Sequence, residues 1–303
     1  MAARRQLAGV CLFARNFDSG DELRALVREV HALFEGDFPP LVCVDQEGGP
    51  VQRIKAPKVP EVQTIPSMRD AGERLDTKRL VALGRTVAIE LARLGINVDF
   101  APVLDVDTNV ANPVIGQRAF GATASEVVNR ALPFARGLRL GGVIPCAKHF
   151  PGHGDTSTDS HVTLPVVDHD AERLAAVELV PFAAAVQAGM PMLMSAHVVF
   201  SALDPSRPAT LSSIVIPLIL RRTWGYEGVV ISDDLDMAAV QRFDIATIAS
   251  GLDAADVDLA LVCKDLAFAE DLAGRLAARP RSLARIGALR STLPPLASAA
   301  RPA

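Results

Sequence analysis

The chain has 303 residues, of which 50% are hydrophobic and 22% are charged, and its formal net charge at pH 7 is -4. This length and composition are typical of one large α/β domain or two small ones, with enough chain to bury a core without disulfide bonds. The weak negative charge and the scattered arginines exclude a broad basic surface of the kind that binds nucleic acid, so we expect no nucleic-acid partner.

No part of the sequence predicts a membrane span or a secretion signal. A run of eighteen apolar residues, which would predict a transmembrane helix, does not occur. The first apolar run follows two arginines and is too short and too interrupted for a signal peptide. We therefore expect a cytoplasmic protein with no membrane partner.

The four cysteines are Cys11, Cys43, Cys146 and Cys263, and their spacing matches neither a metal knuckle nor a disulfide framework. Three of them, Cys11, Cys43 and Cys263, lie in apolar runs and are predicted to be buried free thiols. This pattern fits a reducing compartment.

Short apolar runs alternate with amphipathic stretches along the whole chain. The runs are rich in Val, Ile and Leu, which is typical of strands buried on both faces, and they cover 7–13, 40–45, 96–106, 142–150, 191–200, 228–234 and 258–263. The stretches with apolar residues at three- and four-residue steps predict helices over 21–36, 71–94, 124–138, 171–188, 211–222 and 266–278. This alternation predicts a parallel sheet with helical crossovers.

Two forms of such a sheet compete, a doubly wound sheet and a (β/α)₈ barrel. A doubly wound sheet concentrates its chemistry near one switch point, whereas a barrel places polar residues at the carboxyl ends of many strands. Here nearly every strand ends in polar side chains, so we predict a TIM-like barrel formed by residues 1–303 as a single domain. Only seven strands are found, so one barrel strand is either missing or misread. The Ala/Pro-rich end near 294–303 is expected to be a disordered tail.

The segment CAKHFPGHGDTSTDSH, residues 146–161, carries three of the six histidines. A zinc site from His149, His153 and His161 is disfavoured, because the proline after Phe150 breaks the helical spacing that pairs two histidines. A phosphate loop is also weak, since the P-loop spacing of glycines and lysine is absent. An acid–base site fits better, because Asp159 can orient His161 two residues later.

Other strand ends offer carboxylates and cations. In ISDDLDM, residues 231–237, we expect one aspartate to point into the barrel mouth and Asp234 to cap the next helix. In DQEGGPVQR, residues 45–53, Asp45 and Arg53 either bind sugar hydroxyls or brace each other. Arg118 either binds substrate or staples its own loop. His197 and Asp105 are expected to support other residues rather than to react.

Five segments in this order resemble the family 3 glycoside hydrolases. They are DQEGGPVQR, NVDFAPVLDVD, NPVIGQRAFG, KHFPGHGDTSTDSH and GVVISDDLDM, and the likeness extends from about residue 8 to about residue 265. More closely, these segments resemble the single-domain bacterial β-N-acetylglucosaminidases of cell-wall recycling.

The resemblance implies a retaining glycosidase on a TIM-like barrel. It implies that Asp233 is the nucleophile and that His161, paired with Asp159, is the acid/base. The residues implied to bind substrate hydroxyls are Asp45, Arg53, Arg118, Lys148 and His149. The implied substrate is a muropeptide with a non-reducing terminal N-acetylglucosamine, cleaved without a cofactor or a metal, and we expect a monomer.

Two departures from the family pattern occur. The usual first strand and helix are absent, which matches the count of seven strands and would leave an edge open for pairing with another chain. Pro50 replaces a frequent arginine.

Three alternatives stay open: a phosphorylase that uses the same site, an inactive sugar-binding protein, and a metal-dependent hydrolase. The loop with His161 is expected to be mobile and to be displaced from the site without ligand.

Overall fold

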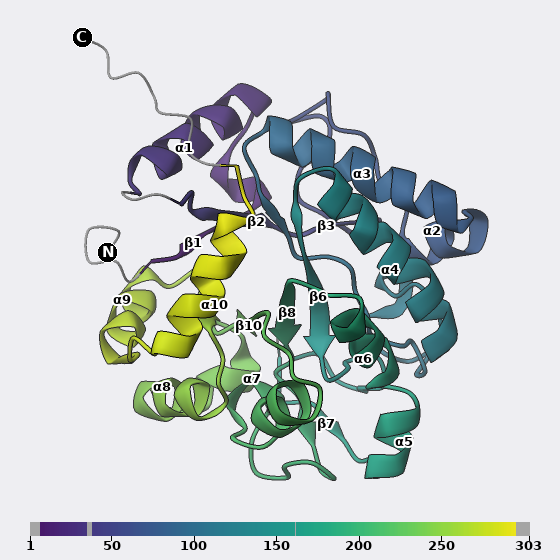
Figure 1. Cartoon of the computed structure of the whole chain (residues 1–303), viewed down its shortest axis with the longest axis vertical. Coiled ribbons are helices and arrows are strands. Elements are labelled where there is room, and N and C mark those ends of the chain that lie inside the picture. The colour runs from purple at the N-terminus through teal and green to yellow at the C-terminus, as the bar shows by residue number, and fades with distance from the viewer. Residues whose placement is uncertain (1–6, 35–37, 161, 295–303) are drawn as a thin grey trace.

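A parallel sheet forms the centre of the molecule (Figure 1). In the computed structural model, the described residues are 7–34, 38–160 and 162–294. Within them, the sheet contains, in spatial order, β1 (Gly9–Leu12), β2 (Leu41–Val44), β5 (Val98–Asp99), β6 (Ile144–Phe150), β8 (Met192–Ser195), β10 (Val229–Asp234) and β11 (Leu259–Leu261). Two short pairs lie outside this sheet, β3 (Gln46–Gly48) with β4 (Val51–Gln52) and β7 (Val166–Val167) with β9 (Val199–Phe200).

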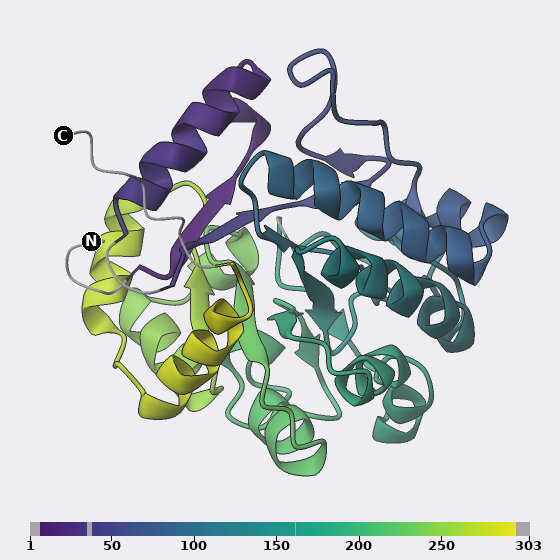
Figure 2. The same cartoon turned by 45° about the horizontal axis from the view of Figure 1, so that its top comes forward.

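Helices surround the sheet, as Figure 2 shows from a second direction. The α-helices are α1 (Gly20–Ala32), α2 (Met68–Arg74), α3 (Thr77–Arg93), α4 (Ala124–Leu140), α5 (Ala171–Ala176), α6 (Val180–Gln187), α7 (Ala238–Gln241), α8 (Ile245–Ala254), α9 (Leu266–Arg275) and α10 (Pro280–Ser291). Other helical turns are η2 (Ala14–Asn16), η3 (Gly116–Arg118), η4 (Ala209–Leu211) and the π-helix η5 (Val215–Thr223). The alternation of strands and helices gives the predicted parallel α/β barrel class, which is confirmed.

The structure corrects several predicted boundaries. The stretch 71–94 is two helices, because the Asp76 side chain accepts the Arg79 amide hydrogen at 2.8 Å and starts a new one. The stretch 171–188 is also two helices, the second with Pro181 in its first turn. The strand expected over 96–106 is only β5, since Pro102 has no amide hydrogen to donate. Helices α8 and α10 were missed.

Two large apolar clusters and a small third one hold the described part of the fold together. One large cluster lies between the sheet and the helices, and the other fills the inside of the curved sheet. Side chains from β2, β5, β6, β8 and β10 form the inner cluster, which also includes Leu289 of α10 and Leu293 just after it. A filled interior of this kind is typical of a barrel, whose core is packed rather than hollow.

The sheet has two edge strands in the described ranges, because β1 pairs only with β2 and β11 pairs only with β10. Both are less buried than the central strands: β11 is half-buried throughout and β1 is buried only at Leu12. Of the cysteines predicted to be buried, Cys43 is buried, but Cys11 and Cys263 are half-exposed. The prediction for those two was wrong because they lie on and beside the edge strands.

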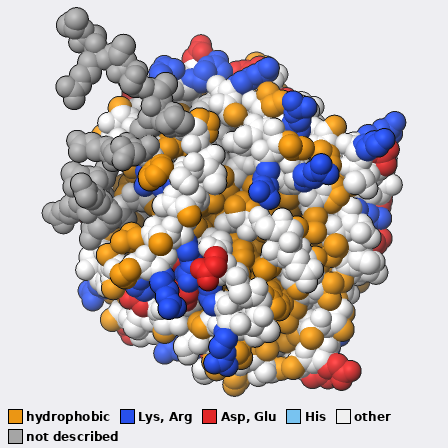
Figure 3. All heavy atoms as spheres, in the orientation of Figure 1, with side chains coloured by type: hydrophobic (Ala, Val, Ile, Leu, Met, Phe, Trp, Pro, Cys, Tyr) orange, Lys and Arg blue, Asp and Glu red, His pale blue; other side chains and the backbone are white. Residues whose placement is uncertain are grey.

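Charged side chains of both signs are interspersed on the face shown in Figure 3. None of the helices in the described ranges combines the length and the hydrophobicity that a membrane span needs. The predicted tail near 294–303 falls almost entirely outside the described residues.

Candidate active site

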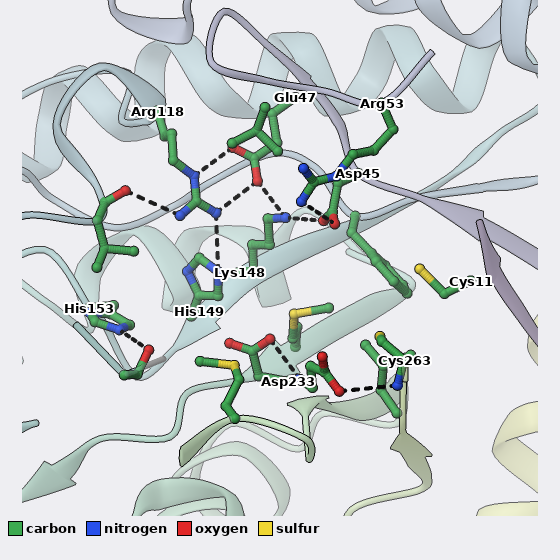
Figure 4. A pocket seen from close by; sticks show the side chains of 18 of the residues that line it. Cys11, Asp45, Glu47, Arg53, Arg118, Lys148, His149, His153, Asp233 and Cys263 are labelled. Atoms are coloured by element: carbon green, nitrogen blue, oxygen red, sulfur yellow. Dashed lines mark hydrogen bonds and ion pairs between the residues drawn. The ribbon is translucent and has the colours of Figure 1, made fainter. Parts of the chain in front are cut away.

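A pocket of about 180 Å³ lies where the carboxyl ends of several strands meet (Figure 4). Its wall includes residues from or just after β1, β2, β6, β10 and β11. Six of the eight predicted site residues line it, namely Asp45, Arg53, Arg118, Lys148, His149 and Asp233. The carboxyl ends of barrel strands are the usual place for catalysis, so this pocket is the candidate active site.

The segment after β2 makes a tight turn that turns Asp45 and Glu47 toward the pocket. Gly48 and Gly49 have φ of 108° and 54°, in the left-handed region that favours glycine. A Cβ on Gly49 would also lie 2.7 Å from the Ser67 Cα. The Gln46 side chain bonds both the amide and the carbonyl of Ile54, at 3.0 and 2.7 Å, and so closes the turn.

Four charged side chains, Asp45, Glu47, Arg118 and Lys148, form what we call the pocket ion cluster. Arg118 donates two hydrogen bonds of 2.8 Å to the Glu47 carboxylate. Lys148 lies 2.7 Å from Asp45 Oδ1 and 2.5 Å from Glu47 Oε1. The Arg53 guanidinium lies 3.4 Å from Asp45 Oδ2. The predicted ion pair between Asp45 and Arg53 is therefore present, but it is longer than the two ion pairs of Lys148.

The electrostatics keep Glu47 and Lys148 charged. Burial raises the pKa of Glu47, but Arg118 and Lys148 outweigh it and lower the pKa to about 2. Burial lowers the pKa of Lys148, but Asp45 and Glu47 outweigh it and raise the pKa. Arg118 also donates to the Val114 carbonyl oxygen at 3.2 Å, so it staples its loop as well as facing the pocket.

The Asp105 carboxylate holds His149 in place, which agrees with the supporting role predicted for Asp105. The Asp105 carboxylate accepts the Nδ1 hydrogen of His149 at 2.7 Å and the backbone amide hydrogens of His149 and His153 at 3.2 and 2.7 Å. This leaves His149 Nε2 on the pocket side, 3.5 Å from Arg118 Nη2. His197 is buried and contacts Thr210 at 2.9 Å and the Asp234 carbonyl oxygen at 3.1 Å.

The two aspartates at the end of β10 have different environments. Asp233 Oδ1 accepts the Asp234 amide hydrogen at 2.8 Å, and the Asp233 side chain lies on the pocket wall. Asp234 Oδ1 accepts the amide hydrogens of Asp236 and Cys263, both at 3.1 Å. The prediction that Asp234 caps the next helix was wrong, because the residue at the cap position of α7 is Met237. The Asp234 carboxylate instead holds the loop between β10 and α7 against the segment that follows β11.

The loop after β6 lies against the pocket through Ser160. Ser160 is buried on the pocket wall, its Oγ lies 3.1 Å from His153 Nε2, and its carbonyl oxygen accepts the Ala239 amide hydrogen at 3.3 Å. The expectation of a displaced loop is therefore wrong for this described part. His153 has the loop-shaping place expected of it, since its Nδ1 also contacts Thr156 Oγ1 at 2.8 Å.

The predicted acid/base pair is only partly described. Asp159 is half-buried next to Ser160, and its carbonyl oxygen accepts the amide hydrogens of Val162 and Thr163, both at 3.0 Å. His161 lies outside the described residues. The roles assigned to Asp159 and His161 therefore stay predictions.

The two described histidines of this segment, His149 and His153, have ring nitrogens that other side chains already engage. In His153, both ring nitrogens are engaged by hydroxyl groups, and burial lowers the pKa of its imidazole to about 4. His149 Nδ1 is engaged by Asp105. Among the described residues, no group of three or more His, Cys, Asp or Glu side chains could hold a metal ion.

Glu47 is a member of the site that had no role in the sequence analysis. Its side chain is fully buried and forms ion pairs with both Arg118 and Lys148. These two residues come from segments of the chain that are distant from Glu47 in sequence. A signal was present, because Asp45 and Glu47 are two residues apart after a strand and side chains at that spacing share a face.

Comparison with known proteins agrees with this geometry. A family profile described as the glycosyl hydrolase family 3 N terminal domain matches residues 1–278. A beta-hexosaminidase of Bordetella avium is 39% identical over 92% of this chain and 80% of its own length. One of Chromobacterium violaceum is 39% identical over 91% of this chain and 77% of its own length.

Solved structures have the same fold. A family 3 beta-N-acetylglucosaminidase from Paenibacillus sp. str. FPU-7 is 36% identical with a TM-score of 0.89, and the match covers 95% of this chain but only 57% of that one. NagZ from Neisseria gonorrhoeae in complex with N-trifluoroacetyl-D-glucosamine is 34% identical with a TM-score of 0.84, and the match covers 95% of this chain and 84% of that one. The chain therefore belongs to glycosyl hydrolase family 3 and is a glycoside hydrolase.

Proposed function

We propose that the protein is a retaining β-N-acetylglucosaminidase that removes a non-reducing terminal N-acetylglucosamine from peptidoglycan-derived muropeptides. The observation that carries this proposal is the position of Asp233, a half-exposed carboxylate on the pocket wall at the end of β10. The pocket ion cluster and His149 line the same small cavity (Figure 4). A sugar ring in that cavity would have hydrogen-bonding groups on one side and a nucleophile on another.

The charge of Asp233 supports its role as nucleophile. Burial raises the pKa of Asp233, but His149, His197 and the Asp234 amide outweigh it and leave the pKa below its usual range. The carboxylate is therefore ionised at neutral pH, which is the form that attacks an anomeric carbon.

The sugar specificity is supported by the relatives. The curated relatives are named beta-hexosaminidases, the Paenibacillus protein is a beta-N-acetylglucosaminidase, and the NagZ structure holds an N-acylated glucosamine. Each of these matches covers 91% or more of this chain, so a substrate with an acylamino group is the first to test.

In the proposed reaction, Asp233 attacks the anomeric carbon and the bond to the leaving oxygen breaks. His161 gives its proton to that oxygen, and a glycosyl ester forms on Asp233. His161 then takes a proton from water, which attacks the ester and releases the sugar with its original anomeric configuration.

Replacement of Asp233 tests this proposal. Asp233→Ala should lower kcat on an aryl β-N-acetylglucosaminide by ~10³-fold or more, because the covalent step is lost. Asp21→Ala is a matched control, since Asp21 is 94% exposed on α1 and is not among the residues that line the pocket. Azide should restore turnover in Asp233→Ala and give an α-glycosyl azide, because it enters from the face that the carboxylate left. Full activity without azide would rule out Asp233 as the nucleophile.

Replacement of His161 tests the acid role. His161→Ala should slow substrates with poor leaving groups more than activated aryl glycosides, and equal losses would count against the acid role.

The remaining alternatives predict different products. An N-acetylglucosamine 1-phosphate product in phosphate buffer would show a phosphorylase instead. Binding of N-acetylglucosamine with no turnover of β-N-acetylglucosaminide, β-glucoside or β-xyloside would show a sugar-binding protein.

A further inference from the structure

Two loops that carry pocket residues meet on one side of the site. The Arg118 loop, residues 113–118, ends at Arg118, and the His153 loop, residues 153–160, follows β6 and ends at Ser160. His149 lies between them, because its Nε2 is 3.5 Å from Arg118 Nη2 and its ring centroid is 5.8 Å from that of His153. Figure 4 shows Arg118, His149 and His153 on the same side of the pocket. The position of one loop relative to the other therefore shapes this side of the site.

The side chain of Asn112 bonds both loops. Its Oδ1 accepts the amide hydrogens of Val114 and Ile115, both at 2.8 Å. Its Nδ2 donates to the carbonyl oxygens of His153 and Gly154, at 2.9 and 3.1 Å. An asparagine amide offers two donor hydrogens and an acceptor oxygen, so it can bond one loop through amides and the other through carbonyls.

The first arm of Asn112 leads directly to Arg118. The peptide group between Val114 and Ile115 donates its hydrogen to Asn112 Oδ1. The oxygen of the same peptide group accepts a hydrogen bond from Arg118 Nη1 at 3.2 Å. Asn112 therefore fixes the backbone group that orients the Arg118 guanidinium.

The second arm leads to Ser160. Besides its bonds to the two carbonyl oxygens, Asn112 Nδ2 lies 3.2 Å from Thr156 Oγ1, which in turn contacts His153 Nδ1 at 2.8 Å. The other ring nitrogen of His153 lies 3.1 Å from the Oγ of Ser160, on the pocket wall. Asn112 therefore holds the start of the His153 loop, from which the imidazole reaches the pocket end of the same loop.

Neighbouring side chains hold only one of the two loops. Thr108 Oγ1 donates to Asp155 Oδ1 at 2.8 Å, and Asn109 Nδ2 donates to the Thr156 carbonyl oxygen at 3.3 Å. In the described ranges, the hydrogen bonds of these two side chains do not reach the Arg118 loop. The link between the loops therefore depends on Asn112.

We propose that Asn112 is a positioning residue, which fixes the Arg118 loop and the His153 loop relative to each other so that both meet the same sugar. The inference rests on the proposed function, in which Arg118 binds the sugar and the residues around Ser160 act on the leaving group. Asn112 is not among the residues that line the pocket, so it acts through the two loops. Groups held in one arrangement need no reordering when the substrate binds.

Two substitutions separate the two arms. Asn112→Asp keeps the acceptor for Val114 and Ile115 but loses both donors, and its carboxylate faces the carbonyl oxygens of His153 and Gly154. Asn112→Ala removes both arms. In hydrogen exchange followed by mass spectrometry, Asn112→Asp should speed exchange about tenfold in 153–160 and leave 114–118 unchanged, whereas Asn112→Ala should speed it in both segments.

Steady-state kinetics on a β-N-acetylglucosaminide with a poor leaving group connects the loops to the reaction. Asn112→Asp should lower kcat about tenfold with little change in KM, because the His153 loop loses its anchor. Asn112→Ala should also raise KM about fivefold, because Arg118 loses the support of its loop. A residue that serves stability alone would lower Tm in both variants without this split between kcat and KM.

Asn109→Asp is the matched control, since it is the same substitution three residues earlier and affects one bond to the His153 loop. It should change exchange and kcat by less than about twofold. Exchange of 153–160 at the wild-type rate in Asn112→Asp, equal losses in Asn109→Asp, or a normal kcat despite faster exchange would each overturn the proposal. Exchange requires no reaction, so the predicted pattern in a wild type that lacks glycosidase activity would refute the proposed function and leave the link between the loops standing.

Discussion

Two networks of ion pairs lie at opposite ends of the sheet and serve different purposes. The pocket ion cluster is at the carboxyl ends of the strands. At the amino ends, Arg221, Asp256, Asp258 and Arg285 form a second network, which we call the basal ion cluster. In the basal cluster, Arg221 also donates to the carbonyl oxygens of Tyr226 and Gly228, both at 2.7 Å, and Asp258 accepts the Val230 amide hydrogen at 2.9 Å.

The two clusters bind different kinds of groups, and this explains why they serve different purposes. The basal ion cluster binds backbone groups, so it fixes the path of the chain where η5, β10, β11 and α10 meet. In the pocket ion cluster, the carboxylates are bound mainly by other charged side chains, which face a cavity where a ligand can replace part of these contacts. Similar burial and similar charges therefore support stability at one end and ligand binding at the other.

The largest expected effects come from one arginine in each cluster. Arg118→Met should lower kcat/KM by about 10²–10³-fold, because Glu47 and Lys148 lose their orientation toward the substrate. It should also reduce the free energy of unfolding by about 3–5 kcal/mol, since buried Glu47 loses a bidentate partner. Arg285→Met should reduce the free energy of unfolding by about 1–3 kcal/mol and leave kcat/KM nearly unchanged.

The two variants are matched because both remove a guanidinium whose side chain is mostly buried, 13% exposed in Arg118 and 7% in Arg285. Urea unfolding and steady-state kinetics on the same aryl glycoside distinguish the roles. A loss of kcat/KM in Arg285→Met as large as in Arg118→Met would refute the division between the two clusters.

The next effect concerns Asp99, a buried carboxyl beneath the pocket ion cluster. Its Oδ1 accepts the Gln46 amide hydrogen at 3.0 Å, but its Oδ2 is buried with no hydrogen-bond partner among the residues that the structure describes. Burial raises the pKa of Asp99 to about 8, although the Gln46 amide and Lys148 lower it. The protonated form is therefore favoured in the folded protein at neutral pH.

Asp99→Asn should change how stability depends on pH. The pKa of Asp99 is higher in the folded chain than in the unfolded chain. Its protonated carboxyl group therefore contributes fully to the free energy of unfolding below pH ~4, and this contribution is lost as the pH rises toward about 8. Asparagine keeps the acceptor for Gln46 and does not ionise. The variant should gain up to about 1.4 kcal/mol per pH unit over the wild type in that range. Urea unfolding at several pH values checks this, and a difference independent of pH would contradict it.

The sequence predicted the repeating strands and most of the polar residues at the strand ends, because hydrophobic runs and polar ends are local features. It missed α10, whose buried positions include Ser282 and Arg285 as well as Leu289, so the apolar periodicity is broken. It also missed α8, which buries small residues such as Ala249 and Gly251. The function of Glu47 depends on Arg118 and Lys148, which approach it only in the folded chain, and no local pattern shows such a contact.

The smallest expected effect concerns the loop that carries the predicted acid/base pair. Ser160→Ala removes the contact between Ser160 Oγ and His153 Nε2, but the backbone bond from Ala239 to Ser160 stays. Loss of one such contact costs about 1 kcal/mol, so kcat should fall roughly fivefold if the loop orients His161. KM should change less, because the residues of the pocket ion cluster are untouched.

Ser157→Ala is the matched control, since it is the same substitution in the same loop at an exposed position. It should leave kcat unchanged, and neither variant should lower Tm by more than about 2 °C. An equal fall of kcat in both variants would point to a general loosening of the loop. An unchanged kcat in Ser160→Ala would show that the contact with His153 does not position the acid/base, and the anchor would then be the backbone bond from Ala239 alone.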